Sequence, residues 1–147
     1  MDRALALAAQ AAALGEVPVG AVVTRGSEVI AEAHNGPREH HDPTAHAEIL
    51  AIRRAAETLG DERLTDCELW VTLEPCAMCA GAAYWVGLGR VVYGLSERSL
   101  KDLTGNHPEN PTLDLPCRIV FDAGQRKVEV LGPLLEDEAA ALHEGIW

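Results

Sequence analysis

The sequence predicts one mixed α/β domain in which a β-hairpin is followed by parallel β-α-β units. Its 147 residues, with no internal repeat and no inter-domain linker, have the length of a single domain over 1–147. β-branched runs of strand length alternate with segments of helical composition, which is the order of an α/β fold. Hydrophobic residues form 48% of the chain, so a core can be filled without disulfides.

The expected elements cover most of the chain. They are, in order, a helix over 2–14, strands over 17–24 and 28–33, a helix over 46–59, a strand over 68–73, a helix over 77–86, a strand over 90–93, a short helix over 114–123, a strand over 128–131 and a helix over 134–143. The segments between them contain Gly, Pro, Asn and Asp, the residues that favour turns.

The first helix and the hairpin follow from local composition. Residues 2–14 consist mainly of Ala and Leu and stop at Gly15, which is typical of a helix that packs closely on a sheet. A Gly-Ser turn at 26–27 separates two β-branched runs and therefore predicts a hairpin. Gly20, inside the first of these strands, indicates either a close approach of another backbone or a bulge.

The middle elements have clear starts and stops. Thr44 is expected to be the N-cap of a helix that Gly60 ends, which places residues 46–48 in its first turn. In the strand after this helix, the alternation of side chains puts Leu69 and Val71 on the same face of the sheet. The next two elements, the helix over 77–86 and the strand over 90–93, belong to the parallel β-α-β part of the predicted fold.

The C-terminal third begins with an irregular segment. Residues 95–116 are polar and rich in Pro, Asn and Asp, which predicts a loop. A loop of this length in a compact domain is usually functional or disordered. The last helix is acidic at 136–138, and Glu-Gly-Ile-Trp comes after it at 144–147.

Four residues, one His, one Glu and two Cys, form the candidate catalytic motif. His46 is followed two residues later by Glu48, and further on by Cys76 and Cys79 in the stretch Pro-Cys-Ala-Met-Cys. One imidazole and two thiolates are ligands that suit zinc, and three protein ligands leave a fourth position for water. Zinc lowers the pKa of such a water toward neutrality and so generates a hydroxide nucleophile. Glu48 is the candidate general acid and base beside it.

The cysteines also permit other interpretations. A Cys-x-x-Cys pair occurs in redox proteins and in structural zinc sites as well. A redox pair leaves His46 and Glu48 unexplained, and a four-cysteine site would need Cys67 and Cys117, which stand alone and far apart. A non-catalytic module, stabilised by zinc or active in redox chemistry, is kept as an alternative.

Charge and composition limit the partners. Twelve basic and twenty-three acidic residues give a net charge of −11, which opposes binding to nucleic acid because that affinity comes from Lys and Arg at phosphates. Four cysteines, two of them assigned to the metal, suggest a reducing compartment. Neither a secretory leader nor an apolar run of membrane-spanning length is evident, so we expect a cytoplasmic protein without a membrane partner.

The His-x-Glu and Pro-Cys-x-x-Cys motifs resemble those of the cytidine deaminase-like superfamily, over most of the chain. The resemblance implies a three-layer α/β/α sandwich with a central five-stranded mixed sheet and zinc between two helix starts. It implies that His46, Cys76 and Cys79 bind zinc and that Glu48 carries protons. It also implies a homodimer.

The two halves resemble different members of the superfamily. The stretches Glu-Val-Pro-Val-Gly-Ala-Val-Val, His-Asp-Pro-Thr-Ala-His-Ala-Glu and Thr-Leu-Glu-Pro-Cys-Ala-Met-Cys are most similar to bacterial tRNA adenosine deaminases. After Ala83 the pattern departs from that group, and the last helix is acidic where that group has a basic one. Tyr84-Trp85 and Trp147 are more similar to enzymes that act on free guanine, cytosine or nucleosides.

We therefore expect a hydrolytic deaminase of a free nucleobase or nucleoside, of guanine or cytosine type. Zinc-bound hydroxide would attack the ring carbon that bears the amino group, with release of ammonia. A free base needs no flipping out of a nucleic acid, so no basic groove is required. Deamination of adenosine in tRNA is the alternative, favoured by the first half of the chain and opposed by its charge.

Several residues are candidates for substrate contacts. Asn35 ends a strand, and the resemblance implies that it contacts base or sugar. Further candidates around it are Val17, Ala47 and Glu74. The resemblance to free-base deaminases also suggests that Glu144 and Trp147 fold over the pocket mouth, whereas packing of Trp147 on the core or on a dimer partner is the alternative.

Overall fold

The computed structural model describes residues 1–105 and 107–147. Its elements are α1 (Asp2–Ala13), β1 (Gly20–Arg25), β2 (Glu28–His34), α2 (Pro37–His40), α3 (Ala47–Leu59), β3 (Glu68–Leu73), α4 (Ala77–Trp85), β4 (Arg90–Leu95), α5 (Glu97–Thr104), α6 (Cys117–Asp122), β5 (Glu129–Leu131) and α7 (Glu136–Ala141). None of the helices in these ranges is long and apolar enough to cross a membrane.

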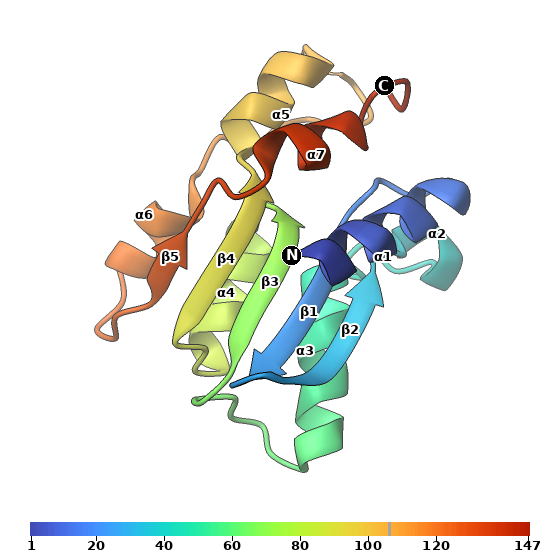
Figure 1. The fold of residues 1–147 in the computed structure, drawn as a ribbon. Helices are drawn as coiled ribbons and strands as arrows, with labels where there is room; N and C mark the ends of the chain where they lie inside the picture. Colours follow the sequence, from blue (N-terminus) through green and yellow to red (C-terminus); the bar gives the residue numbers. More distant parts are fainter. Residues whose placement is uncertain (106) are drawn as a thin grey trace.

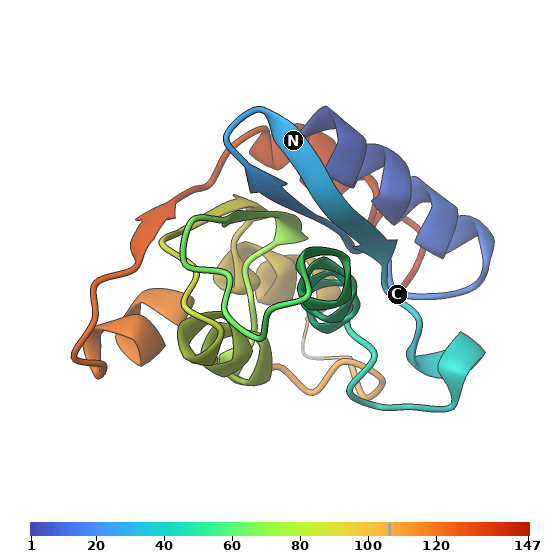
Figure 2. The ribbon, with the colours of Figure 1, turned by 90° about the horizontal axis from the view of Figure 1, so that it is seen from below.

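A five-stranded sheet in the order β2-β1-β3-β4-β5 forms the middle layer (Figure 1). β1 pairs antiparallel with β2 and β3, whereas β4 pairs parallel with β3 and β5. Helices α3, α4 and α6 cover one face, and α1 and α7 lie over the other (Figure 2). The predicted mixed sheet with a helical layer on each face is therefore confirmed.

The alternation of side chains along the strands determines what each face packs against. Leu69 and Val71 on β3 are fully buried in the core cluster that includes α3, α4 and α6. The intervening Trp70 packs instead with Val22 against the apolar side of α1. The side chains that the sequence assigned to opposite faces of β3 therefore lie on opposite faces of the sheet.

Helix α1 lies directly on the backbone of β1. Ala4 and Ala8 have no exposed surface, and a Cβ atom built on Gly20 would stand 2.7 Å from the Ala8 nitrogen and closer still to the Ala4 carbonyl oxygen. The irregularity in the pairing of β1 with β2 lies elsewhere, between Val23 and Thr24. Of the two interpretations of Gly20, the close backbone approach is the right one.

The predicted loop over 95–116 was wrong for its first part, which forms α5. Ser96 caps this helix by accepting a hydrogen bond from the Ser99 amide at 3.1 Å, and Gly105 ends it in the left-handed conformation. Leu100 is the one buried residue of α5, so the segment has the polar composition of a loop. Asn106, which belongs to the same prediction, lies outside the described residues.

Several details of other elements also differ from the prediction, and the helices expected over 114–123 and 134–143 are shorter at both ends. Thr44 is not the N-cap of α3, because its hydroxyl donates to Asp42 at 2.7 Å and the helix begins one residue after His46. The first strand begins at Gly20 and not at 17, since Pro18 lacks the amide that a ladder needs. A short helix, α2, also occupies part of the predicted loop over 34–44.

A matched pair of glycine substitutions tests the close packing of α1 on β1. Gly20→Ala should lower the free energy of unfolding by about 1–3 kcal/mol, because backbone atoms of α1 must move. Gly81→Ala, in the middle of α4 where nothing lies within 4 Å of an added Cβ, should leave it unchanged or raise it by up to ~1 kcal/mol. Urea unfolding of both variants measures this, and equal losses would contradict the predicted contact.

Candidate metal centre and active-site cavity

The two motifs lie at the starts of two helices that pack side by side. His46 is the N-cap residue of α3 and Cys76 is the N-cap residue of α4, both in the extended backbone conformation that lets a chain turn into a helix. Cys79 lies one turn into α4 and is fully buried. Because helix N-termini carry positive partial charge, this arrangement favours thiolates and carboxylates at the same place.

The three side chains have the geometry of a zinc site. The Nδ1 atom of His46 lies 3.7 Å from the sulfur of Cys76 and 3.5 Å from that of Cys79, and all three ligand atoms lie within 4.8 Å of one another. Tetrahedral bonds of roughly 2.0 Å to nitrogen and 2.3 Å to sulfur would place N and S about 3.5 Å apart. One imidazole and two thiols at these separations therefore fit zinc.

The ionisation of the site agrees with its metal-binding chemistry. Hydrogen bonds with Cys79 and His46 lower the pKa of the Cys76 thiol to about 4, so the thiolate that zinc requires is its stable form. Glu48, in the first turn of α3, is only 4% exposed, and its burial raises the pKa of the carboxyl to about 7. A carboxyl group in this range both takes up and releases protons at neutral pH.

A cavity of about 360 Å³, within the range of small-molecule sites, opens beside the three ligands. Its wall is acidic and contains Glu16, Glu48, Glu74, Glu97 and Glu109. Arg38 is the arginine of this wall, and its guanidinium donates to the Gly15 carbonyl at 2.7 Å and lies 3.5 Å from the Glu109 carboxylate. The wall thus contains five glutamates and one arginine, and that arginine is exposed.

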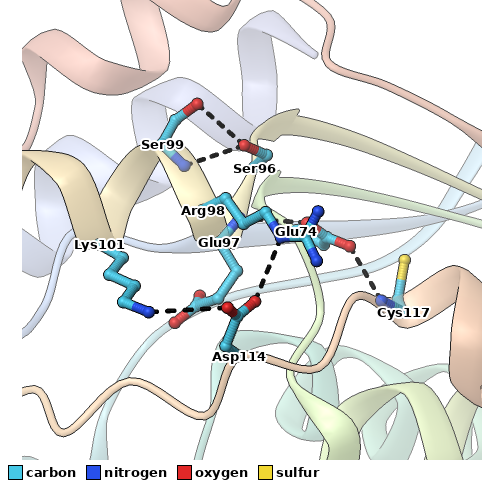
Figure 3. Close-up of polar contacts among 8 residues, drawn as sticks. All are labelled: Glu74, Ser96, Glu97, Arg98, Ser99, Lys101, Asp114 and Cys117. Atoms are coloured by element: carbon cyan, nitrogen blue, oxygen red, sulfur yellow. Dashed lines mark hydrogen bonds and ion pairs between the residues drawn. The ribbon is translucent and has the colours of Figure 1, made fainter.

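The predicted substrate residues lie in different places. Asn35, only 6% exposed, and Val17 line the cavity. Ala47 is fully buried in the core cluster and is not part of the cavity wall. Glu74 also lines the cavity, but both of its carboxylate oxygens accept hydrogen bonds from backbone amides, one from Cys117 at 2.8 Å and one from Glu97 at 3.1 Å (Figure 3).

The C-terminal residues lie beside the cavity and not in its wall. The ring of Trp147 stacks on His143 at a centroid distance of 6.5 Å and tilts against His107 at 5.9 Å. Trp147 lines a neighbouring groove that shares Glu16, Val17, Arg38 and Glu109 with the cavity. A covering role for Glu144 and Trp147 stays a prediction.

Sequence reasoning missed three carboxylates of the wall, those of Glu16, Glu97 and Glu109. Glu16 comes after α1, and its side chain accepts a hydrogen bond from the Glu39 amide at 2.8 Å. Glu97 begins α5, and burial raises the pKa of its carboxyl to about 7. The available signal for Glu97 was the capping serine at position 96, which marks a helix start inside the supposed loop.

A mixed sheet between helices, with one imidazole and two thiols meeting at two helix starts beside a buried carboxyl, defines a zinc-dependent hydrolase. Residues 1–95 match the family model described as the cytidine and deoxycytidylate deaminase zinc-binding region. The chain belongs to this family of zinc-dependent deaminases. The expectations of an enzyme and of a zinc cofactor are confirmed, and the non-catalytic alternative is set aside.

Three relatives show how wide the family is. A probable cytosine deaminase of Schizosaccharomyces pombe is 35% identical over all 147 residues, which span 90% of that protein. A tRNA-specific adenosine deaminase of Buchnera aphidicola is 44% identical over 97% of this chain and 82% of that protein. The solved structure of a guanine deaminase from Nitrosomonas europaea, 27% identical, matches with a TM-score of 0.83 over 99% of this chain and 81% of its own.

Substitution of the cysteines tests the ligand set. Cys76→Ala should lose zinc, and its melting temperature should fall because the metal joins two helix starts. Cys67→Ala removes a thiol that is more deeply buried than that of Cys76, at 1% exposure, and should keep one zinc per chain. Elemental analysis and thermal unfolding of both variants measure this. Loss of zinc from Cys67→Ala would show that the assignment of three ligands is wrong.

Proposed function

We propose that this zinc-dependent deaminase acts on a free nucleobase or nucleoside of guanine or cytosine type. The observation that carries the proposal is the acidic wall of the cavity, which contains five glutamates and one arginine, Arg38. Carboxylates accept hydrogen bonds from the ring N–H and amino groups of a base, whereas they repel phosphate. The site therefore suits a substrate that brings donors and no negative charge.

The residues around the metal site have separate roles in the proposed reaction. Zinc held by His46, Cys76 and Cys79 supplies the Lewis acid that makes water nucleophilic at neutral pH. Glu48 takes one proton from the attacking water and gives it to the ring nitrogen, and it then takes the remaining proton from the new hydroxyl group and gives it to the leaving amino group. Addition of water to the amino-bearing carbon and loss of ammonia leave a carbonyl group there, so atoms balance without any further reactant.

Other wall residues orient the base. The Asn35 amide can both donate and accept, which suits the mixed edge of a nucleobase. Glu97 supplies an acceptor from α5, on a different part of the wall, for a second N–H group. Val17 and Leu100 contribute apolar surface for the ring. Recognition by side chains from several elements favours one orientation of a small planar substrate.

Deamination of adenosine in tRNA is the second candidate, because the Buchnera relative that bears this activity in its name is 44% identical. Against it stands the net charge of −11, since RNA affinity depends on Lys and Arg contacts to phosphates. Affinity for tRNA at physiological salt should then be no better than non-specific, roughly 10⁻⁴ to 10⁻⁶ M.

An ammonia-release screen of the zinc-loaded enzyme tests the proposal. It compares guanine, cytosine, their nucleosides, the matching 5′-monophosphates and tRNA. We expect turnover of at least one free base or nucleoside, with kcat/KM about tenfold or more below it for the monophosphate, because the added charge faces carboxylates. Inosine formation in tRNA at a rate that matches the best small substrate would reverse the order of the two candidates.

Two glutamates of the same helix test the proton carrier. Glu48→Gln should keep zinc, because the side chain is not a ligand, and should lower kcat by about two to four orders of magnitude. Glu57→Gln, on the exposed side of α3, is the matched control and should retain wild-type kinetics. Near-normal turnover in a zinc-replete Glu48→Gln enzyme would remove Glu48 from the mechanism.

A further inference from the structure

Glu74 joins the metal-ligand segment to two distant helices. It lies between the end of β3 and the ligand Cys76, with only 5% of its surface exposed. Its amide donates to the Leu95 carbonyl at 2.8 Å, which extends the pairing of β3 with β4 beyond the strand end. Its carboxylate accepts from the amides of Glu97 and Cys117, 23 and 43 residues further along the chain (Figure 3).

Both amides belong to the first residue of a helix, where the N–H groups have no hydrogen-bond acceptor within the helix. The first N–H groups of any helix need acceptors from outside it, and a carboxylate is favoured there by the helix dipole. At α6 the N-cap residue is Pro116, which provides no side-chain acceptor, so Glu74 supplies one from across the structure. At α5, Ser96 accepts from the Ser99 amide and Glu74 accepts from the Glu97 amide.

The same bond fixes the position of the cavity wall. Glu97 and Leu100 of α5 line the cavity together with the ligands His46 and Cys76. On its outer side α5 is held by Asp114, whose carboxylate lies 3.2 Å from Arg98 and 3.6 Å from Lys101 (Figure 3). These ion pairs are exposed and contribute little, whereas the bond between the Glu97 amide and Glu74 is partly buried and is made by a carboxylate that is itself only 5% exposed.

We propose that Glu74 is a positioning residue that sets the location of the Glu97 carboxylate relative to the metal site, and thereby the recognition of a substrate N–H group. This role differs from the direct substrate contact that the sequence suggested, because both oxygens are already bound to backbone amides. The inference rests on the proposed function, in which Glu97 accepts a hydrogen bond from the base.

Glu74→Gln separates this role from a merely structural one. Glutamine keeps one acceptor and replaces the other with an NH₂ group, which cannot accept from a backbone amide. We expect full zinc content and a fall of about tenfold to a hundredfold in kcat/KM, the loss typical of a hydrogen bond to a charged group. Ser96→Ala is the matched control. It removes the other cap of α5, so its melting temperature should fall while kcat/KM stays within about twofold of wild type.

A double-mutant cycle with Glu97→Gln shows whether Glu74 acts through Glu97. If it does, Glu74→Gln should change kcat/KM by less than about twofold in the Glu97→Gln background. Independent, multiplicative losses would overturn the inference, and so would a Glu97→Gln enzyme with wild-type kinetics. A wild-type enzyme that deaminates no base in the screen would instead be a failure of the proposed function.

Amide hydrogen exchange of the zinc-loaded wild-type protein tests the contact itself, even if Glu74→Gln does not fold. The amides of Glu97 and Cys117 should exchange slowly, whereas a first-turn helix amide without a protein acceptor exchanges rapidly. Rapid exchange at both positions would show that the contact is absent and would overturn the inference.

Discussion

The convergence of one imidazole and two thiols within 4.8 Å is the constraint on which the rest of the fold depends. Its three side chains come from the starts of α3 and α4, so both helices must begin at the same end of the sheet and lie side by side. Their buried faces consist mainly of alanine, including Ala51 and Ala55 on α3 and Ala80 and Ala83 on α4, all without exposed surface. Short side chains allow close interaxial distances, and close packing brings the first turns together.

Electrostatics explain how so many carboxylates can share one cavity wall. Buried carboxylates normally need cations, but Glu74 accepts from two backbone amides and Glu16 from one. Amides satisfy the oxygens without adding a counter-charge, so the cavity keeps its acidic character. The same low-dielectric surroundings raise the pKa of Glu97 to about 7. Such a wall favours ligands that bring N–H donors and disfavours anions.

The parts of the molecule that could be predicted from sequence are those with local signals. The zinc ligands are specified by residue type and spacing, and the two faces of β3 by simple alternation. Helix α5 was missed because one buried leucine gives no apolar periodicity, although its serine cap and terminal glycine were readable. The bonds of Glu74 could not be predicted, because its partners lie 23 and 43 residues away and only the tertiary fold brings them together.

The homodimer stays a prediction. On the surface of the single chain, Trp85 of α4 is a large aromatic side chain that is 76% exposed.

The division between the two parts of the chain bears on how substrates are selected in this family. The family model ends at residue 95, and the metal ligands and Glu48 all lie before that point. Proteins named for cytosine, guanine and tRNA adenosine are all similar to this chain, so one fold is found with several substrates. We infer that the C-terminal segment contributes to the choice among them. In this chain Glu97, Leu100, Glu109 and Asn110 supply the later part of the cavity wall. Glu74 stands at the junction, since it lies two residues before Cys76 inside the matched region and bonds to the first residue of α5 beyond it. A change in the segment after residue 95 can thus alter the part of the cavity wall that α5 and the following chain supply, while the candidate zinc ligands and Glu48 stay in place.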